Sequence, residues 1–252
     1  MIVSAILYVA ALIFIIGVAR KVVQYASTPA PLKIPTTPAP VTVPGVVLRM
    51  FNEVVLFQSL FKASKFTWIF GWLFHAGLFF VLLCHLRLFT ESVWWWVAIL
   101  APYSRIAGFV MVFGLAGLLC RRVFVDRVRI ISAPSDYLML VLILLIGGSG
   151  LLMRLVSVAD LAYAAEFARG LVQFELSDFP GSFVIHLHLL SVAILLIIFP
   201  FSKLLHAPGV FFSPSRNQVD NARERRYGGR SINARSEVAA TKRDDKNGKS
   251  NG

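Results

Sequence analysis

The sequence contains few charged residues and few cysteines. Asp, Glu, Lys and Arg make up only 15% of the 252 residues, whereas 57% are hydrophobic and the mean hydropathy is +0.73. A soluble domain of this length cannot cover so much apolar surface. Cys84 and Cys120 stand far apart, so there is no C-x-x-C-H motif and no paired-cysteine zinc or iron–sulfur spacing. The chain also lacks a P-loop and a dinucleotide-binding glycine motif, so any ligand chemistry must depend on other residues.

Long apolar runs are what the sequence does contain. A helix needs roughly 20 apolar residues to cross a bilayer, and five segments reach that length, at about 2–19, 67–87, 104–121, 135–153 and 182–206. The run from Trp94 to Ala101 is either the outer turn of the third segment or a separate interfacial piece, because Pro102 interrupts the pattern. The sequence therefore predicts an all-α integral membrane protein, a bundle of five transmembrane helices.

The positive charges predict how these helices are oriented. The first segment has no basic residue ahead of it and two directly behind it, the reverse of a secretory signal, so we expect a retained helix. The first and third loops and the C-terminal tail contain every Lys and Arg except Arg87, Arg105, Arg154 and Arg169. This bias puts the N-terminus outside and the C-terminus in the cytoplasm of a bacterial inner membrane. The net charge of +12 reflects topology and anionic lipid, and we expect no nucleic-acid partner.

The chain divides into four parts along its length. Residues 1–20 form the first membrane helix, and 21–66 form a cytoplasmic segment with a proline-rich strap followed by an amphipathic helix. The strap is either a spacer or a contact with a cytoplasmic partner, and the helix either lies in the membrane interface or docks a protein. Residues 67–206 form the four-helix membrane core. Residues 207–252 form a basic cytoplasmic tail, which we expect to be disordered unless bound.

All five histidines lie on two of the apolar segments, His75 and His85 on the second and His186, His188 and His206 on the fifth. An imidazole in hydrocarbon is costly unless its nitrogens find partners, so these histidines are candidates for holding a cofactor. At about 100° per residue, His188 and His206 share a helix face and His186 points nearly opposite. This favours His188 as a ligand. His186 is expected at the outer interface, or hydrogen-bonded to a propionate or a quinone.

Antiparallel second and fifth helices would bring the histidines together as two pairs. His75 would meet His206 in the cytoplasmic half and His85 would meet His188 in the outer half, so each pair can hold one haem iron. The axial spacings disagree, since His75 and His85 are about 15 Å apart and His188 and His206 about 27 Å apart at 1.5 Å per residue. The helices must therefore tilt or bend, and Pro200 can supply part of a bend.

The spacing H-x9-H on the second segment, and H-x17-H ending in FPFSKLLH on the fifth, resemble the cytochrome b (gamma) subunit of respiratory nitrate reductase. The resemblance covers the five-helix body. It implies a membrane subunit with two haem b groups that passes electrons between quinone and a cytoplasmic catalytic partner. It also implies that the axial ligands are His75, His85, His188 and His206, paired as above.

The connecting segments resemble a narrower family. TPAPLKIPTTPAP, FKASKFTWIFGWLFH and SKLLHAPGVFFSPSRNQVDN look like the M subunit (DsrM) of DsrMKJOP, the membrane complex associated with dissimilatory sulfite reductase. This implies sulfur metabolism, a cytoplasmic iron–sulfur partner resembling heterodisulfide reductase, and further membrane and periplasmic redox subunits. A respiratory nitrate reductase or a heterodisulfide reductase-like complex is the alternative assembly.

Several arginines at helix ends are candidates for neutralising haem propionates, with ordinary interfacial anchoring as the alternative: Arg87, Arg105, Arg121 and Arg122. Arg87 and His186 are candidates for the quinone side.

A haem-free membrane anchor or transporter is the competing class of function. A transporter should show internal repeats, and none is visible. The GGSG run at 147–150 either interrupts the fourth helix or allows close helix packing. An anchor would need no histidines, so their clustering favours the haem reading.

Overall fold

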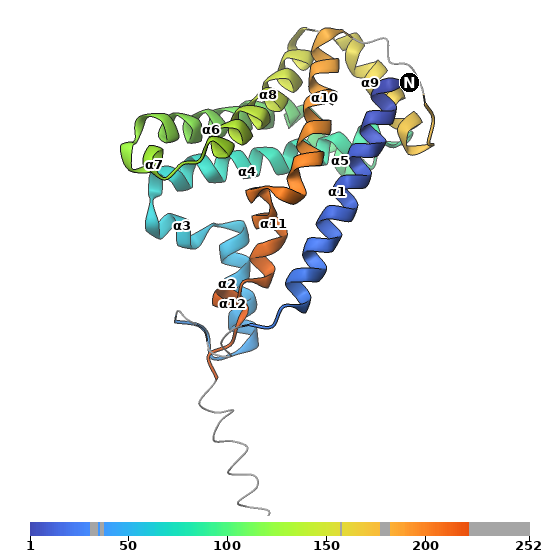
Figure 1. Cartoon of the computed structure of the whole chain (residues 1–252). Coiled ribbons are helices and arrows are strands. Elements are labelled where there is room, and N and C mark those ends of the chain that lie inside the picture. Colours follow the sequence, from blue (N-terminus) through green and yellow to red (C-terminus); the bar gives the residue numbers. More distant parts are fainter. Residues whose placement is uncertain (31–34, 36–37, 157, 177–181, 222–252) are drawn as a thin grey trace, which may run out of the picture. The chain divides into compact units, whose positions relative to one another are not determined.

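All regular elements in the described part of the computed structural model are helical (Figure 1). The structure describes residues 1–30, 35, 38–156, 158–176 and 182–221. The predicted basic tail beyond residue 221, and residues 31–34, 36 and 37 of the proline-rich strap, therefore lie outside the described residues. The chain forms two compact units, Met1–Gln24 with Leu56–Ala207, and Tyr25–Val55 with the residues from Pro208 onward.

Five helical segments within the described residues are long and apolar enough to cross a membrane: Ile2–Ser27, Lys65–Leu88, Trp95–Phe124, Pro134–Val156 and Phe183–Phe201. They confirm the predicted all-helical, five-span membrane architecture. The orientation of the two termini stays a prediction.

The spans are built from the helices α1 (Ile2–Ser27), α4 (Lys65–His85), α6 (Ser104–Phe124), α8 (Pro134–Val156) and α10 (Phe183–Ile198), with short helices around them. The third span begins with a separate short helix, followed by a 3-10 turn. The other elements of the first unit are α3 (Gln58–Ala63), η1 (Leu86–Leu88), α5 (Trp95–Leu100), η2 (Ala101–Tyr103), α7 (Asp126–Ile130), α9 (Val158–Val172), η3 (Phe199–Phe201) and η4 (Lys203–Leu205). The second unit contains α2 (Val43–Val55), η5 (Val210–Phe212) and α12 (Pro214–Asn217), while α11 (His206–Gly209) spans the boundary.

Glycines let α4 and α6 approach closely along their length (Figure 1). A Cβ atom at Gly77 would lie 2.7 Å from the backbone nitrogen of Met111, and one at Gly114 would lie 2.6 Å from that of Phe74. Small residues at such crossings are typical of helix packing in membranes. α6 also packs on α8, and α8 packs on α10. α8 runs unbroken through residues 147–150, so the GGSG run serves packing and does not interrupt the helix.

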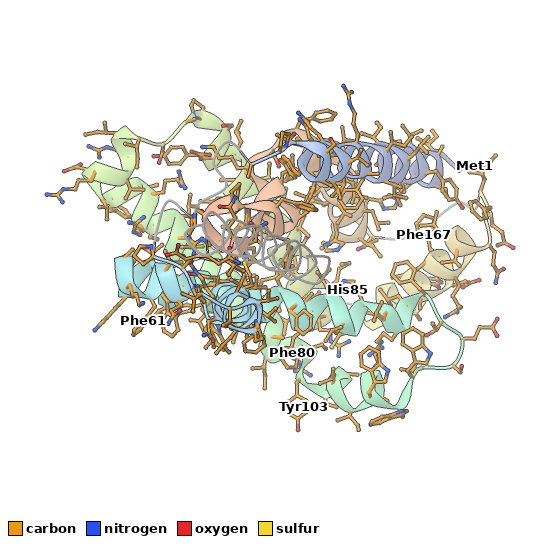
Figure 2. The ribbon with its side chains drawn as sticks, turned by 90° about the horizontal axis from the view of Figure 1, so that it is seen from below. Met1, Phe61, Phe80, His85, Tyr103 and Phe167 are labelled. Carbon is orange, nitrogen blue, oxygen red and sulfur yellow. The ribbon has the colours of Figure 1, made fainter. Side chains whose placement is uncertain are left out.

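A second core cluster joins the start of α1 to α9 and α10. Phe167 and Ile185 are buried there against Val3 and Leu7 (Figure 2, near Met1). The Tyr8 hydroxyl donates to the carbonyl of Leu171 at 2.9 Å. Within the first unit, α9 therefore packs on the start of α1 and on α10.

The fifth span departs from the single helix expected over 182–206. α10 ends at Ile198, a 3-10 turn follows, and Ser202 adopts an extended conformation with φ −110° and ψ 172°. Pro200 lacks the backbone N–H that an α-helix needs and its ring clashes with the preceding turn, which accounts for the interruption. His206 therefore lies beyond a break and is not on the helix that carries His188.

The amphipathic stretch before the second span also divides. α2 ends at Val55, and Phe57 adopts the left-handed conformation with φ 51° before α3 begins. Positive φ is uncommon for a bulky residue and turns the chain sharply. In the second unit, α2 packs on α12 through an ion pair between Glu53 and Arg216, and the amide of Asp220 donates to the carbonyl of Pro40.

Candidate functional site

The first candidate site lies between His75 on α4 and His206 at the start of α11. Their ring centroids are 6.1 Å apart and the ring planes cross at 80°. Nδ1 of His75 lies 2.7 Å from the carbonyl oxygen of Gly71, and Nδ1 of His206 lies 2.8 Å from that of Lys203. A carbonyl oxygen can only accept, so each Nδ1 donates its proton and each Nε2 keeps a lone pair. Hydrogen bonds of this kind orient an imidazole that binds a metal through its other nitrogen.

This separation fits an iron held between two imidazoles. A metal–nitrogen bond of about 2.0 Å and roughly 1.1 Å from the nitrogen to the ring centroid place two axial imidazole centroids about 6.2 Å apart. The observed 6.1 Å agrees with that value. The spacing of the His75 and His206 rings is therefore compatible with an iron between them, and their assignment as axial ligands stays a prediction.

Aromatic rings enclose His75. Phe74 lies 4.6 Å and Phe57 lies 5.0 Å from it, measured between ring centroids. The left-handed conformation of Phe57 directs the chain so that its ring meets the imidazole edge to face. An apolar shell of this kind limits water at a metal site and helps to set its reduction potential.

The second candidate site involves His85 and His188. Nδ1 of His85 donates to the carbonyl of Val81 at 2.7 Å, and Nδ1 of His188 lies 3.0 Å from the carbonyl of Ile146. The pairing of these two imidazoles stays a prediction. His85 lies on the face of α4 turned toward the rest of the unit, away from the exposed Phe80 (Figure 2).

Two α8 residues shape the surroundings of His188, and sequence reasoning did not identify either. Ser149 places its hydroxyl 3.1 Å from Nδ1, and a Cβ atom at Gly150 would lie 3.3 Å from Cε1 of the ring. Both belong to the GGSG run, whose small side chains leave room for an imidazole. A polar serine within an apolar span was the signal that could have singled it out. The conformation of Phe57 left no comparable signal in the sequence.

His186 takes part in neither pair. Its Nδ1 lies 3.0 Å from the carbonyl of Ser182 in the first turn of α10. It is two positions from His188 on α10, or about 200° around the helix. The assignment of His186 outside the ligand set stays a prediction.

The candidate arginines fall at two places. Arg87 lies in η1 and Arg105 in the first turn of α6, and Arg154, which the sequence did not single out for the site, donates to the carbonyl of Ala101 at 3.4 Å. Arg121 and Arg122 occupy the last turn of α6. Arg122 is engaged by Ser132 and Asp136, so protein groups already satisfy its charge.

No three His, Cys, Asp or Glu side chains of the described residues converge on one point. A site with three or four protein ligands for zinc or non-haem iron is therefore not formed by this part of the chain. Two imidazoles are all that a six-coordinate haem requires of the protein. The donor set thus fits haem better than it fits a bare metal ion.

Comparison with known proteins agrees with this geometry. Residues 41–219, which include all five histidines, match the model of the nitrate reductase gamma subunit family. The chain is similar to the Hdr-like menaquinol oxidoreductase cytochrome b-like subunit of Archaeoglobus fulgidus, at 34% identity over 265 residues, 87% of this chain and 80% of that protein. The protein of the same description from Archaeoglobus profundus is 32% identical over 268 residues, 87% of this chain and 79% of that protein.

Proposed function

Since the chain belongs to the nitrate reductase gamma subunit family, we propose that it is a dihaem b-type cytochrome subunit that transfers electrons across the membrane. One observation carries the proposal. His75 and His206, from segments far apart in the sequence, present their rings at the separation a bis-imidazole iron requires. His85 and His188 supply the second haem.

The protein groups determine what such haems can do. With two imidazoles bound, the iron has no open position, so a haem held this way exchanges electrons and does not activate oxygen. The backbone carbonyls of Gly71, Val81, Ile146 and Lys203 each fix one imidazole through Nδ1. A fixed ring orientation and a stronger ligand nitrogen tune the potential of each haem.

Quinone is the proposed small-molecule partner. The two Archaeoglobus relatives are named for menaquinol, so we assign a menaquinone-type quinone to this chain as well. Arg87 and His186 are the proposed residues of the quinone side, near the His85/His188 haem. Arg87 lies in the turn directly after His85, and Arg105 and Arg154 add positive charge that would suit haem propionates.

A cytoplasmic iron–sulfur subunit resembling heterodisulfide reductase is the proposed protein partner, in line with the Hdr-like description of the relatives. The second unit supplies a surface for it, because α2 exposes one apolar stripe at i, i+4, i+8 and i+12: Val43, Val47, Phe51 and Val55. The strap and tail segments that resemble DsrM make sulfur metabolism the proposed pathway. Oxidation of quinol outside, with electrons passing inward, would then separate charge across the membrane.

The test is a pyridine haemochrome assay with reduced-minus-oxidised spectra on the purified chain and its single variants. We expect two b haems in the wild type and the loss of one in each of His75→Ala, His85→Ala, His188→Ala and His206→Ala. His186→Ala is the matched control and should keep both. An intact, well-folded wild type without haem would refute the proposal and favour a membrane anchor or transporter.

A further inference from the structure

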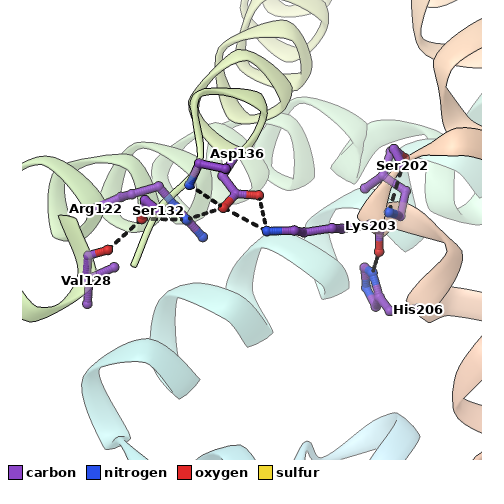
Figure 3. A network of polar contacts seen from close by, with 9 residues as sticks. Arg122, Val128, Ser132, Asp136, Ser202, Lys203 and His206 are labelled. Carbon is purple, nitrogen blue, oxygen red and sulfur yellow. Dashed lines mark hydrogen bonds and ion pairs between the residues drawn. The ribbon is translucent and has the colours of Figure 1, made fainter. Parts of the chain in front are cut away.

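Asp136, at the start of α8, forms the centre of a polar network (Figure 3). Nζ of Lys203 lies 2.7 Å from Oδ1 and 2.9 Å from Oδ2, and the Arg122 guanidinium lies 3.1 Å from Oδ2. The backbone amide of Ala133 donates to Oδ2 at 3.2 Å. The Asp136 side chain is only 10% exposed, so the network holds this carboxylate away from solvent.

Further hydrogen bonds hold Arg122, the arginine partner of Asp136, in place. Arg122 also donates to the hydroxyl of Ser132 at 2.7 Å, and that hydroxyl donates to the carbonyl of Val128 at 2.6 Å. The Tyr137 hydroxyl donates to the carbonyl of Arg122 at 3.0 Å. These bonds tie the ends of α6 and α8 together, so Asp136 is a fixed point for whatever it binds.

Lys203 joins this fixed point to a haem ligand. It opens the short turn after the break in the fifth span, and its carbonyl accepts the Nδ1 proton of His206 at 2.8 Å (Figure 3). The segment 199–205 is not α-helical, so it lacks the regular ladder that fixes the other three ligands. Within this segment Ser202 accepts from the amide of Leu204 and donates to the carbonyl of Phe199, which are short-range bonds only.

We propose that Asp136 is a positioning residue for the His75/His206 haem. By holding Lys203 it fixes the carbonyl that orients the His206 imidazole, so a carboxylate on α8 sets the geometry of a ligand more than sixty residues away in the sequence. The proposal rests on the haem assignment made above. The Lys203 side chain is 76% exposed, and an ion pair with such a partner contributes little to global stability. Loss of the Lys203 contact should therefore act on the His206 segment more than on folding, and Lys203→Met leaves the contacts of Asp136 with Arg122 and Ala133 in place.

The experiment compares Asp136→Asn, Lys203→Met and the double variant of the full chain in membranes. Each is measured by redox titration of both haems and by electron paramagnetic resonance of the ferric haems, which reports the relative orientation of the axial rings. Signals are assigned with His75→Ala and His85→Ala. Asp126→Asn is the control, because it breaks the exposed ion pair with Arg129 and touches no ligand segment.

In both single variants we expect the resonance of the His75/His206 haem to shift and its redox equilibrium to change three- to tenfold, tenfold being about 59 mV for one electron. The double variant should match the singles, and the other haem should stay unchanged and show that the protein is folded. A charge effect alone would move the potential in opposite directions in Asp136→Asn and Lys203→Met and leave the resonance unaltered, which would overturn the proposal. So would two wild-type-like haems in Asp136→Asn. A wild type without haem would refute the proposed function instead.

Discussion

Substitution of Gly77 tests whether the α4–α6 crossing supports the ligand helix. A Cβ atom there would lie 2.7 Å from the backbone nitrogen and 2.9 Å from Cα of Met111, and 2.8 Å from the carbonyl oxygen of Ala107. All three atoms belong to backbone, so no side-chain rotation relieves the contact. Because ordinary heavy-atom contacts lie at about 3.5–4.0 Å, the two helices must separate by roughly 1 Å in Gly77→Ala.

The cost can be isolated with a matched control. A Cβ atom at Gly148, in the middle of α8, would have no neighbour within 4 Å. Both substitutions gain the same helix propensity, about 1 kcal/mol, so their difference measures the clash. Overpacking of this kind costs about 1–3 kcal/mol. Since 1 kcal/mol shifts Tm by about 2–4 °C in a chain of this length, Gly77→Ala should melt about 2–12 °C below Gly148→Ala.

The assay is thermal unfolding in detergent, followed by far-ultraviolet circular dichroism and, in parallel, by haem absorbance. α4 carries both His75 and His85, so we expect Gly77→Ala to weaken retention of both haems, whereas Gly148→Ala keeps them. Equal melting temperatures for the two variants would refute the close α4–α6 crossing. Loss of stability without any change in haem retention would instead show that the crossing does not position the ligands.

Two further substitutions probe the surroundings of His188. Ser149→Ala removes the hydroxyl 3.1 Å from Nδ1 of His188 but leaves the bond from Nδ1 to the carbonyl of Ile146. Both haems should therefore remain, and only the His85/His188 haem should change its midpoint potential in a redox titration. A shift in the potential of the other haem would contradict this assignment. Gly150→Leu places a large side chain where even a Cβ atom would lie 3.3 Å from Cε1 of His188. It should displace the imidazole and lower the haem content from two to one per chain in a haemochrome assay. Retention of two haems by this variant would contradict the prediction.

The sequence predicts the membrane architecture well because hydropathy acts over whole segments. Each of the five expected spans overlaps a helix of the structure, and the run after Trp94 forms the short helix α5, which leads through η2 into the rest of the third span. Local backbone conformation was less predictable. Neither the left-handed conformation of Phe57 nor the extended conformation of Ser202 follows from composition.

The histidines could be singled out from the sequence because burying an imidazole in an apolar span costs free energy unless its nitrogens find partners. Their partners could not. The Nδ1 atoms of His75 and His85 each donate a hydrogen bond to the carbonyl four residues earlier on the same helix, which is a local contact. The partners of His188, in contrast, are Ile146 and Ser149 on another helix, α8. Contacts between helices depend on how the helices cross, and that in turn depends on glycines whose role becomes visible only in three dimensions.

The break at Pro200 removes the continuous helix on which the mismatch in axial spacing was calculated. A continuous α-helix would separate His188 from His206 by about 27 Å, against about 15 Å between His75 and His85. That rise applies only as far as Ile198, where α10 ends, and the chain then turns through two short 3-10 segments joined by an extended residue. A proline therefore does more here than bend a helix. The segment that carries His206 no longer follows the α-helical repeat, so the His206 ring can contact that of His75. Its position then depends on contacts with other helices, such as the ion pair between Lys203 and Asp136.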